Sequence, residues 1–359
     1  MSFVPGTAVT TKSIRRSPRL RVGFLALTDA APFAVAQELG LFQKHGIEVE
    51  LSREVGWATI REKIIYGELD AAQCLAPMLW STFLGIDSVA CRVLSGLILS
   101  MRGNALTLSN RLWDAGVRDA VTLRDEARRR VGERKLTLGV VFTHSSHNLL
   151  LRSWLKSGGI NPDRDVRIVV VPPAQMFRNL SAGTIDGYCS GEPWNTAAVE
   201  AGIGWCPTWS AAHSLSPIEK VLMVTERFVE SNPAEHQKLI AALLEACAWC
   251  DELKNREALP ELLSSRNYLQ QSAEVIRPSL SGHFACGYGK IEYVPGFHVF
   301  HADNANAPTA QKAERLQKEL REAGLLESAS LPLDLPRQLF REDIYASAMQ
   351  MLPHELVSS

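Results

Sequence analysis

The sequence predicts an α/β protein of two similar lobes, because one αβ pattern occurs in it twice. Each copy shows a strand, a helix, a strand, a helix and a strand, which is typical of a parallel sheet flanked by helices. The matching pairs, each 116 residues apart, are Leu20-Arg-Val-Gly23 with Leu136-Thr-Leu-Gly139, Gly67-Glu-Leu-Asp70 with Gly183-Thr-Ile-Asp186, and Pro77 with Pro193. Ligands bind outside the carboxyl ends of the strands in such sheets, so the repeat predicts binding in a cleft between the lobes.

The first copy alternates apolar runs with turn residues. Leu20–Leu27 is apolar with one glycine, as expected of a buried parallel strand. Gly46-Ile47 ends a helix and starts a strand, and Gly67 closes the next helix. The expected elements are a strand at 20–27, a helix at 32–41, a strand at 48–51, a helix at 59–66 and strands at 69–75, 89–99 and 105–108.

The second copy follows a charged segment and leads into a mainly helical end. Gly158-Gly159 and Gly183 end two of its helices, and Pro172-Pro173 stops a strand. The expected elements are helices at 111–134, 146–157, 175–182, 234–254, 309–323 and 336–350, strands at 136–142, 166–171, 185–188 and 220–225, and an ordered loop at 289–307.

These elements predict a domain organisation with two crossings between the lobes. Lobe 1 comprises residues 20–103 plus 220–359, lobe 2 comprises 104–219, and 1–19 form an N-terminal extension. The crossings lie near Gly103 and Lys220, so a hinge of two strands joins the lobes. Such a hinge is a common means of closing a cleft around a ligand.

Composition limits the class of protein. The net charge of −1 gives no reason to expect nucleic acid or a membrane surface as a direct partner. No stretch approaches the ~18 apolar residues of a membrane span. The seven cysteines lack regular spacing, which favours a reducing compartment. We interpret Cys247-Ala-Trp-Cys250 as buried packing residues, because it lies inside a predicted helix.

Several polar or aromatic residues follow strands, where helix N-termini offer free N–H groups to anions. Trp57 starts a helix after the second strand, and its indole N–H is a donor. Gln73 ends the third strand, where a buried amide needs a partner. Asn104 lies at the first crossing, where it either faces the cleft or supports the turn. For Trp57 the alternative is a role in core packing.

The second lobe and the return crossing offer further candidates. His144 follows the first strand of lobe 2 and can donate to an anion, and His147 is the weaker candidate in the same loop. Gly191 allows close backbone approach to a ligand, while Glu192 is awkward beside an anion and fits better as a residue that orients a donor. Lys220 is the best candidate for a full positive charge, with a surface lysine as the alternative.

Catalytic, cofactor and metal signals are weak. The sequence has no G-x-S-x-G, P-loop or G-x-G-x-x-G motif, and no third ligand completes a zinc site with His144 and His147. Asp70 and Asp186 match each other in the repeat, which favours a shared structural role in a turn over acid–base chemistry. We therefore expect a binding protein that is not an enzyme and has no cofactor or bound metal.

Several stretches together resemble nitrate-binding proteins of the nitrate/bicarbonate transporter group, over residues 20–325. They are Ser52-Arg-Glu-Val-Gly-Trp57-Ala-Thr-Ile-Arg, Gly67-Glu-Leu-Asp-Ala-Ala-Gln73, Ala76-Pro-Met, Asn104-Ala-Leu-Thr-Leu-Ser-Asn, Gly191-Glu-Pro-Trp194-Asn and Glu219-Lys220-Val-Leu. The resemblance implies a type II periplasmic-binding-protein fold around one small anion. It implies that Trp57, Asn104 (or Gln73 as the amide), His144, Gly191 and Lys220 bind that anion.

The resemblance also implies a ligand and a role. Bicarbonate-binding relatives carry an acidic residue in place of the lysine, so Lys220 favours nitrate or nitrite. Residues 1–19 lack the apolar core of a secretory signal, from which we expect a cytoplasmic protein. The group's cytoplasmic members are nitrate/nitrite sensors that sequester a response-regulator-type RNA-binding antiterminator and release it on anion binding, which controls nitrate assimilation genes. The alternative is an exported solute-binding subunit of a nitrate or bicarbonate ABC transporter.

Overall fold

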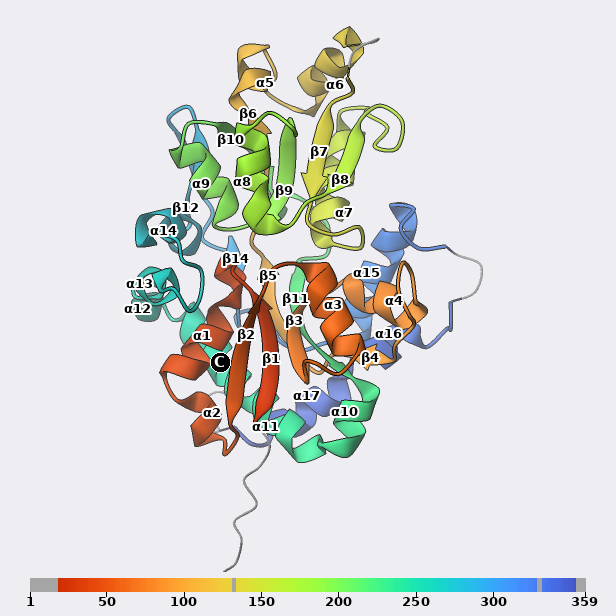
Figure 1. The fold of residues 1–359 in the computed structure, drawn as a ribbon, viewed down its shortest axis with the longest axis vertical. Helices are drawn as coiled ribbons and strands as arrows, with labels where there is room; N and C mark the ends of the chain where they lie inside the picture. Colours follow the sequence, from red (N-terminus) through yellow and green to blue (C-terminus); the bar gives the residue numbers. More distant parts are fainter. Residues whose placement is uncertain (1–18, 131–133, 328–330, 353–359) are drawn as a thin grey trace, which may run out of the picture.

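Two lobes, each built around its own sheet, lie one above the other in the computed structural model, which describes residues 19–130, 134–327 and 331–352 (Figure 1). The sheet of lobe 1 has the order β14-β5-β11-β3-β1-β2, with β4 paired to β11. Its strands are β1 (Leu20–Leu25), β2 (Val49–Glu54), β3 (Ala71–Leu75), β4 (Val93–Leu94), β5 (Ile98–Arg102), β11 (Ile218–Thr225) and β14 (His298–Val299).

The sheet of lobe 2 has the order β10-β6-β9-β7-β8. Its strands are β6 (Asn104–Ser109), β7 (Thr137–Val140), β8 (Arg167–Val170), β9 (Gly187–Gly191) and β10 (Gly204–Trp209). In lobe 1 the parallel strands β2-β1-β3 continue into antiparallel β11, and in lobe 2 the parallel strands β8-β7-β9 continue into antiparallel β6. This shared order confirms the predicted α/β fold of two similar lobes.

The repeated aspartates have the same structural role in both lobes, as the sequence predicts. Asp70 Oδ2 accepts a hydrogen bond of 2.8 Å from the backbone N–H of Arg21, at the start of β1. Asp186 Oδ2 accepts one of 2.8 Å from the backbone N–H of Thr137, at the start of β7. Each carboxylate therefore fastens the turn before a third strand to the beginning of the first strand.

Helices cover both sheets. Those of lobe 1 are α1 (Ala31–Glu38), α2 (Leu41–Lys44), α3 (Trp57–Ile65), α4 (Met78–Leu84), α10 (Glu226–Ser231), α11 (Pro233–Asp251), α12 (Leu253–Arg256), α13 (Leu259–Ser264), α15 (Ala310–Glu322), α16 (Leu335–Leu339) and α17 (Glu342–Met349). Those of lobe 2 are α5 (Asn110–Asp114), α6 (Ala120–Arg129), α7 (Ser146–Ser157), α8 (Pro173–Ser181) and α9 (Trp194–Glu200).

Cys247 and Cys250 are free and buried on α11, as predicted. Within the described ranges, no helix has both the length and the apolarity needed to cross a bilayer.

The chain crosses between the two sheets after β5 and again after β10. Gly103 separates β5 from β6 with φ of +88°, and a Cβ there would lie 2.4 Å from the His298 ring, so only glycine fits. The return runs from β10 to β11 through a short 3₁₀ helix, Ser210–Ala212. A further segment also reaches lobe 2, although the predicted boundaries place all of 220–359 in lobe 1. Helix α14 (Ala273–Ser281) and the hairpin of β12 (His283–Gly287) and β13 (Lys290–Tyr293) contact α9 and β10.

Four predicted elements differ from the structure. The helix expected at 111–134 is two helices, because Gly116 has φ of +90° between α5 and α6, and its residues 131–133 lie outside the described residues. The strand expected at 89–99 is split into β4 and β5, and the helix expected at 336–350 into α16 and α17. The loop expected at 289–307 contains β13 and β14. The predicted extension at 1–19 falls almost wholly outside the described residues.

Candidate functional site

Lys220 lies on β11 between the lobes and is completely buried. Its Nζ is 2.7 Å from Asp29 Oδ2 and 2.6 Å from Glu219 Oε1, and it lies 5.3 Å from the centre of the Trp57 ring. Burial alone would lower the pKa of Lys220, but the attraction of the two carboxylates outweighs burial and raises it. The ammonium group therefore keeps its charge inside the protein.

A bulge allows Glu219 and Lys220 to face the same region. Neighbouring residues of a regular strand point to opposite faces of a sheet. The pairing of β11 with β5 shifts register on both sides of Lys220, which is the mark of a β-bulge. The side chains of Glu219 and Lys220 consequently meet, with both residues at most 1% exposed.

Asp29 follows β1 and is fixed by the predicted residue Gln73. Gln73 Nε2 donates to Asp29 Oδ1 at 2.8 Å, and Gln73 Oε1 accepts from the backbone N–H of Leu25 at 3.1 Å. Burial raises the pKa of Asp29, and the charge of Lys220 opposes that shift. Gln73 thus fixes the position of the Asp29 carboxylate, which in turn pairs with Lys220.

Lobe 2 contributes neutral groups to the same place. Asn104 Nδ2 and Ser146 Oγ both donate to Glu219 Oε2, and His147 Nδ1 lies 3.7 Å from Glu219 Oε1. Ser146 and His147 begin α7, and the N-cap Ser145 accepts a hydrogen bond from Asn148 N–H. A Cβ at Gly191 would lie 3.6 Å from Asn104 Oδ1 and 3.7 Å from Asp29 Oδ2, so Gly191 borders this group of residues. We call the set the Lys220 cluster: Asp29, Trp57, Gln73, Glu219 and Lys220 from lobe 1, with Asn104, Ser146, His147 and Gly191 from lobe 2.

Several polar atoms of the Lys220 cluster have no hydrogen-bond partner among the described residues. They are Trp57 Nε1, Asn104 Oδ1 and both ring nitrogens of His147, and all are buried. Burial, followed by the charge of Lys220, lowers the pKa of His147 well below its usual value, so the ring is neutral with one N–H donor. An unpaired buried polar group costs about 1–3 kcal/mol, so this concentration of such groups indicates a ligand site.

Two predicted site residues lie outside the Lys220 cluster. His144 Nε2 contacts the carbonyl of Leu325 at 2.9 Å, which joins lobe 2 to the segment after α15 in lobe 1. Glu192 Oε2 accepts from the backbone N–H of Thr196 on α9, and its Oε1 has no hydrogen-bond partner in the part of the chain that the structure describes. Burial raises the pKa of Glu192 to about 7. The carbonyl of Glu192 accepts from Thr28 N–H across the junction, so its backbone helps to join the lobes.

The sequence-based prediction missed Asp29, Ser146 and Glu219, and it ranked His147 below His144. A signal for Asp29 and Ser146 was present, because both lie where the first strand of a copy meets its helix. Glu219 gave no such signal. In a regular strand its side chain would point to the other face of the sheet from Lys220, and the bulge that brings them together cannot be read from the sequence.

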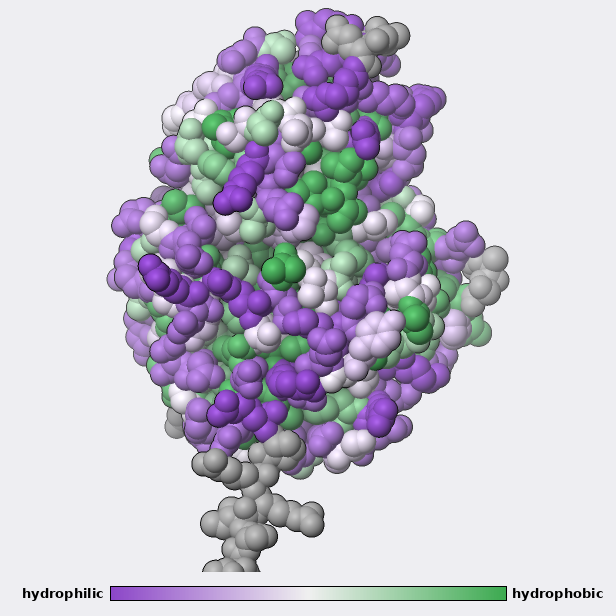
Figure 2. Space-filling model, in the orientation of Figure 1, coloured by the Kyte–Doolittle hydropathy of each residue, from purple (hydrophilic) through white to green (hydrophobic). Residues whose placement is uncertain are grey.

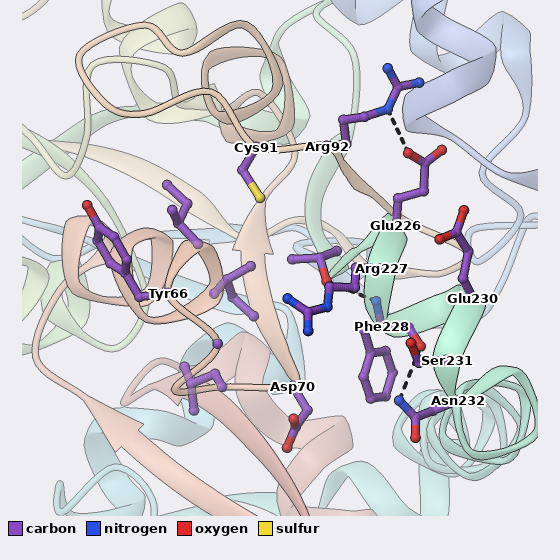
Figure 3. A pocket seen from close by; sticks show the side chains of 15 residues that line it. Tyr66, Asp70, Cys91, Arg92, Glu226, Arg227, Phe228, Glu230, Ser231 and Asn232 are labelled. Carbon is purple, nitrogen blue, oxygen red and sulfur yellow. Dashed lines mark hydrogen bonds and ion pairs between the residues drawn. The ribbon is translucent and has the colours of Figure 1, made fainter.

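Two surface grooves have no residue of the Lys220 cluster in their lining. One, of about 610 Å³, runs along the junction and is lined by both lobes, including Val55, Pro172 and Trp194. Figure 2 shows apolar side chains close to the junction on the viewed face, within a mainly polar surface. The other, of about 640 Å³, lies on lobe 1 and is lined by residues of α3 and α10 (Figure 3). Its Arg92 and Glu226 pair with each other at 2.6 Å, and its Asp70 pairs with Arg21.

Metal binding has no support from the described residues, among which no group of three or more His, Cys, Asp and Glu side chains could hold an ion. The Lys220 cluster itself has an ammonium group at its centre, which repels cations. Its ring, amide, hydroxyl and ammonium donors are instead suited to a small anion.

Comparison with known proteins identifies the family. Residues 15–264 match the model of the NMT1-like family. The chain is 31% identical over 342 residues to the nitrate/nitrite binding protein NrtA of Nostoc, which covers 93% of this chain and 77% of the relative. It is 35% identical to the nitrate import ATP-binding protein NrtC and 37% identical to the bicarbonate transport ATP-binding protein CmpC, both of Synechocystis. The chain spans about half the length of these last two relatives, at 50% each.

Solved structures agree with this assignment. The crystal structure of the periplasmic nitrate-binding protein NrtA from Synechocystis superposes with a TM-score of 0.88 at 28% identity, covering 95% of this chain and 91% of that one. The alkanesulfonate-binding protein SsuA from Xanthomonas axonopodis, at 16% identity and a TM-score of 0.65, shares the fold. The fold is therefore that of the periplasmic binding proteins, and the chain belongs to the NMT1-like family, in the group of substrate-binding proteins that includes the nitrate-binding ones.

Proposed function

We propose that this chain binds nitrate or nitrite at the Lys220 cluster, between its two lobes. The observation that carries the proposal is the buried ammonium of Lys220 over the ring of Trp57, whose indole N–H has no hydrogen-bond partner within the described ranges. Asn104 and His147 reach the same point from lobe 2. The relatives named for nitrate binding support this choice of anion.

The proposed mechanism is differential binding to open and closed lobes. A small planar anion contacts Trp57 and Lys220 on one lobe, and Asn104 and His147 on the other, only when the lobes are closed. It therefore shifts the balance by its difference in affinity for the two states. Reversing a 1:99 balance takes about 5.5 kcal/mol, and charge-assisted hydrogen bonds of ~1.5–3 kcal/mol each can supply it.

We further propose a cytoplasmic sensor that sequesters a response-regulator-type RNA-binding antiterminator and releases it when the anion binds. All seven cysteines are free, including Cys206 and Cys286, which share one small hydrophobic cluster. An odd number of cysteines without disulfides supports the choice of a reducing compartment such as the cytoplasm. In this role the chain is a binding protein without catalytic activity.

The competing proposal is a solute-binding unit of a nitrate or bicarbonate ABC transporter. The similarity to NrtC and CmpC over most of this chain supports it. The two proposals share the site and differ in the partner protein and in whether that partner binds the anion-free or the anion-bound chain. A pull-down with the antiterminator separates them, since a sensor captures it without nitrate and releases it with nitrate.

Calorimetric titration tests the site itself. Nitrate, nitrite, bicarbonate and methanesulfonate are titrated into the purified chain, with chloride as the control anion. We expect one site per chain for nitrate or nitrite. Bicarbonate should bind more weakly, because this chain has Lys220 where the resemblance gives bicarbonate-binding relatives an acidic residue. Tighter binding of bicarbonate than of nitrate would transfer the proposal to bicarbonate, and binding of none of these anions would refute it.

A further inference from the structure

The Glu219 carboxylate lies at the meeting point of donors from both lobes. Lys220 Nζ of lobe 1 is 2.6 Å from its Oε1, while Asn104 Nδ2 and Ser146 Oγ of lobe 2 donate to its Oε2. Glu219 is 1% exposed, so these contacts are shielded from water. The Glu219 side chain of lobe 1 thus accepts the hydrogen bonds that Asn104 and Ser146 of lobe 2 can donate.

The groups around Glu219 overlap those assigned to the anion in the proposed function. A carboxylate resembles nitrate, because both are planar, carry one delocalised negative charge and accept hydrogen bonds at their oxygens. Glu219 occupies Lys220 and Asn104 and approaches His147, and Trp57 Nε1 is left without a partner. The carboxylate therefore satisfies part of the site.

Charge makes simultaneous occupation unfavourable. Asp29 and Glu219 already set two carboxylates against the single ammonium of Lys220 in a buried region. A bound anion would add a third negative charge a few ångströms away, where water screens little. One carboxylate has to move when the anion enters.

Glu219 is the carboxylate that can leave. Asp29 is held from behind by Gln73 Nε2 at 2.8 Å, within its own lobe. Among the described residues, Glu219 receives its polar contacts in lobe 1 from Lys220 alone, and the others come from lobe 2. Parting the lobes would release those contacts and free the side chain.

We infer that Glu219 is an internal competitor for the anion-binding position, which nitrate or nitrite must displace in order to bind. The inference rests on the proposed function. It makes Glu219 the residue that sets the anion concentration at which the protein responds. It also gives Glu219 a second effect, because its contacts with Asn104 and Ser146 draw the lobes together before any anion arrives.

Calorimetry on Glu219→Gln and Glu219→Ala tests the competition. Glutamine keeps the size of the side chain and removes its charge, and alanine removes the competing group. We expect both variants to bind nitrate roughly tenfold more tightly than the wild type, because a repelling charge is lost. Glu226→Gln, on the partly exposed pair with Arg92, is the control that should leave the affinity unchanged. Unchanged or weaker binding in the Glu219 variants would overturn the inference.

Small-angle X-ray scattering of the nitrate-free proteins tests the second effect. We expect Glu219→Ala to have a larger radius of gyration than the wild type, and nitrate to reduce it to the wild-type, nitrate-bound value. Equal radii without nitrate would show that Glu219 does not draw the lobes together. The experiments distinguish failure of the proposed function from failure of this inference. Wild-type protein that binds no anion refutes the proposed function, and bound nitrate with unaltered Glu219 variants refutes this inference alone.

Discussion

The two lobes share one topology and bring different chemistry to their junction. Lobe 1 supplies the carboxyl side chains of Asp29 and Glu219 and the ammonium group of Lys220. Lobe 2 supplies neutral donors from Asn104 and from the start of α7. The charges are therefore collected on one lobe, and the other lobe can close onto them without bringing a charge of its own into the cluster.

The repeat shows how this difference arose on one backbone plan. At the 116-residue offset, Asp29 corresponds to Ser145, and Gln73 corresponds to Cys189. The ionic and amide groups of lobe 1 are thus replaced by a helix cap and a buried thiol in lobe 2. The turn residues Asp70 and Asp186 are unchanged. Residues that define the fold are kept in both lobes, and residues that face the junction diverge.

Removing the charge of lobe 1 should have the largest effect. Lys220→Met leaves Asp29 and Glu219 buried without their counter-charge, and breaking such a group typically costs ~3–5 kcal/mol. We expect a loss of that size in the free energy of unfolding by urea, together with loss of nitrate binding. Lys254→Met, at an exposed pair with Glu252, should change stability by under about 1 kcal/mol. Full nitrate affinity in Lys220→Met would remove the lysine from the site.

A buried acid of lobe 2 should make stability depend on pH. The pKa of Glu192 is raised from 4.5 to about 7 by burial, so folding favours its protonated form. Its contribution is complete below the unfolded pKa and is lost as pH rises through 7, by about 3 kcal/mol in total. We expect Glu192→Gln to remove this loss in urea unfolding at pH 5 and pH 8. Glu200→Gln, exposed at the end of α9, is the control, and an unaltered pH profile in Glu192→Gln would contradict the assignment.

The two histidines of lobe 2 distinguish the sequence-based assignment from the structural one. His147 lies in the Lys220 cluster, and His144 contacts Leu325. We expect His147→Ala to weaken nitrate binding by about 1.5–3 kcal/mol, the worth of a hydrogen bond to a charged group. His144→Ala should leave calorimetric affinity within about twofold, since the hydrogen bond of His144 goes to Leu325, which lies outside the cluster. The reverse result would restore the sequence-based choice.

The matched aspartates should give the smallest effect and the same one in both lobes. Asp70→Asn and Asp186→Asn each weaken a charge-assisted bond to a backbone N–H, at a cost of about 1 kcal/mol, and each also loses partly exposed arginine pairing, to Arg21 for Asp70 and to Arg130 and Arg134 for Asp186. We expect similar drops in the melting temperature and unchanged nitrate affinity. A loss of affinity in either variant would show that these turns also shape the site.

The sequence predicted the lobes well because their signals are local. Apolar runs, glycine stops and matching turns fix the order of strands in each copy. Trp57, Asn104, Gly191 and Lys220 were chosen from the sequence because they lie at strand ends or crossings, and the structure brings these four residues together at the junction.

The rest of the site depends on features that the sequence does not display. The choice between His144 and His147 turns on where α7 begins, and Ser145 as its N-cap places His147 in the first turn. The meeting of Glu219 with Lys220 needs a bulge, and Asp29 needs a counter-charge from far along the chain. The contact of α14 and the β12–β13 hairpin with lobe 2 likewise depends on long-range packing, in which Phe284 joins one hydrophobic cluster with Ala105 and Cys206.

A crystal structure of the chain with nitrate tests the central claim most directly. The account predicts one nitrate between the lobes, within hydrogen-bonding distance of Trp57 Nε1, Lys220 Nζ and His147, with the Glu219 carboxylate moved away from Lys220. Nitrate bound outside the junction, or lobes that close around Glu219 with the anion excluded at saturating concentration, would contradict it.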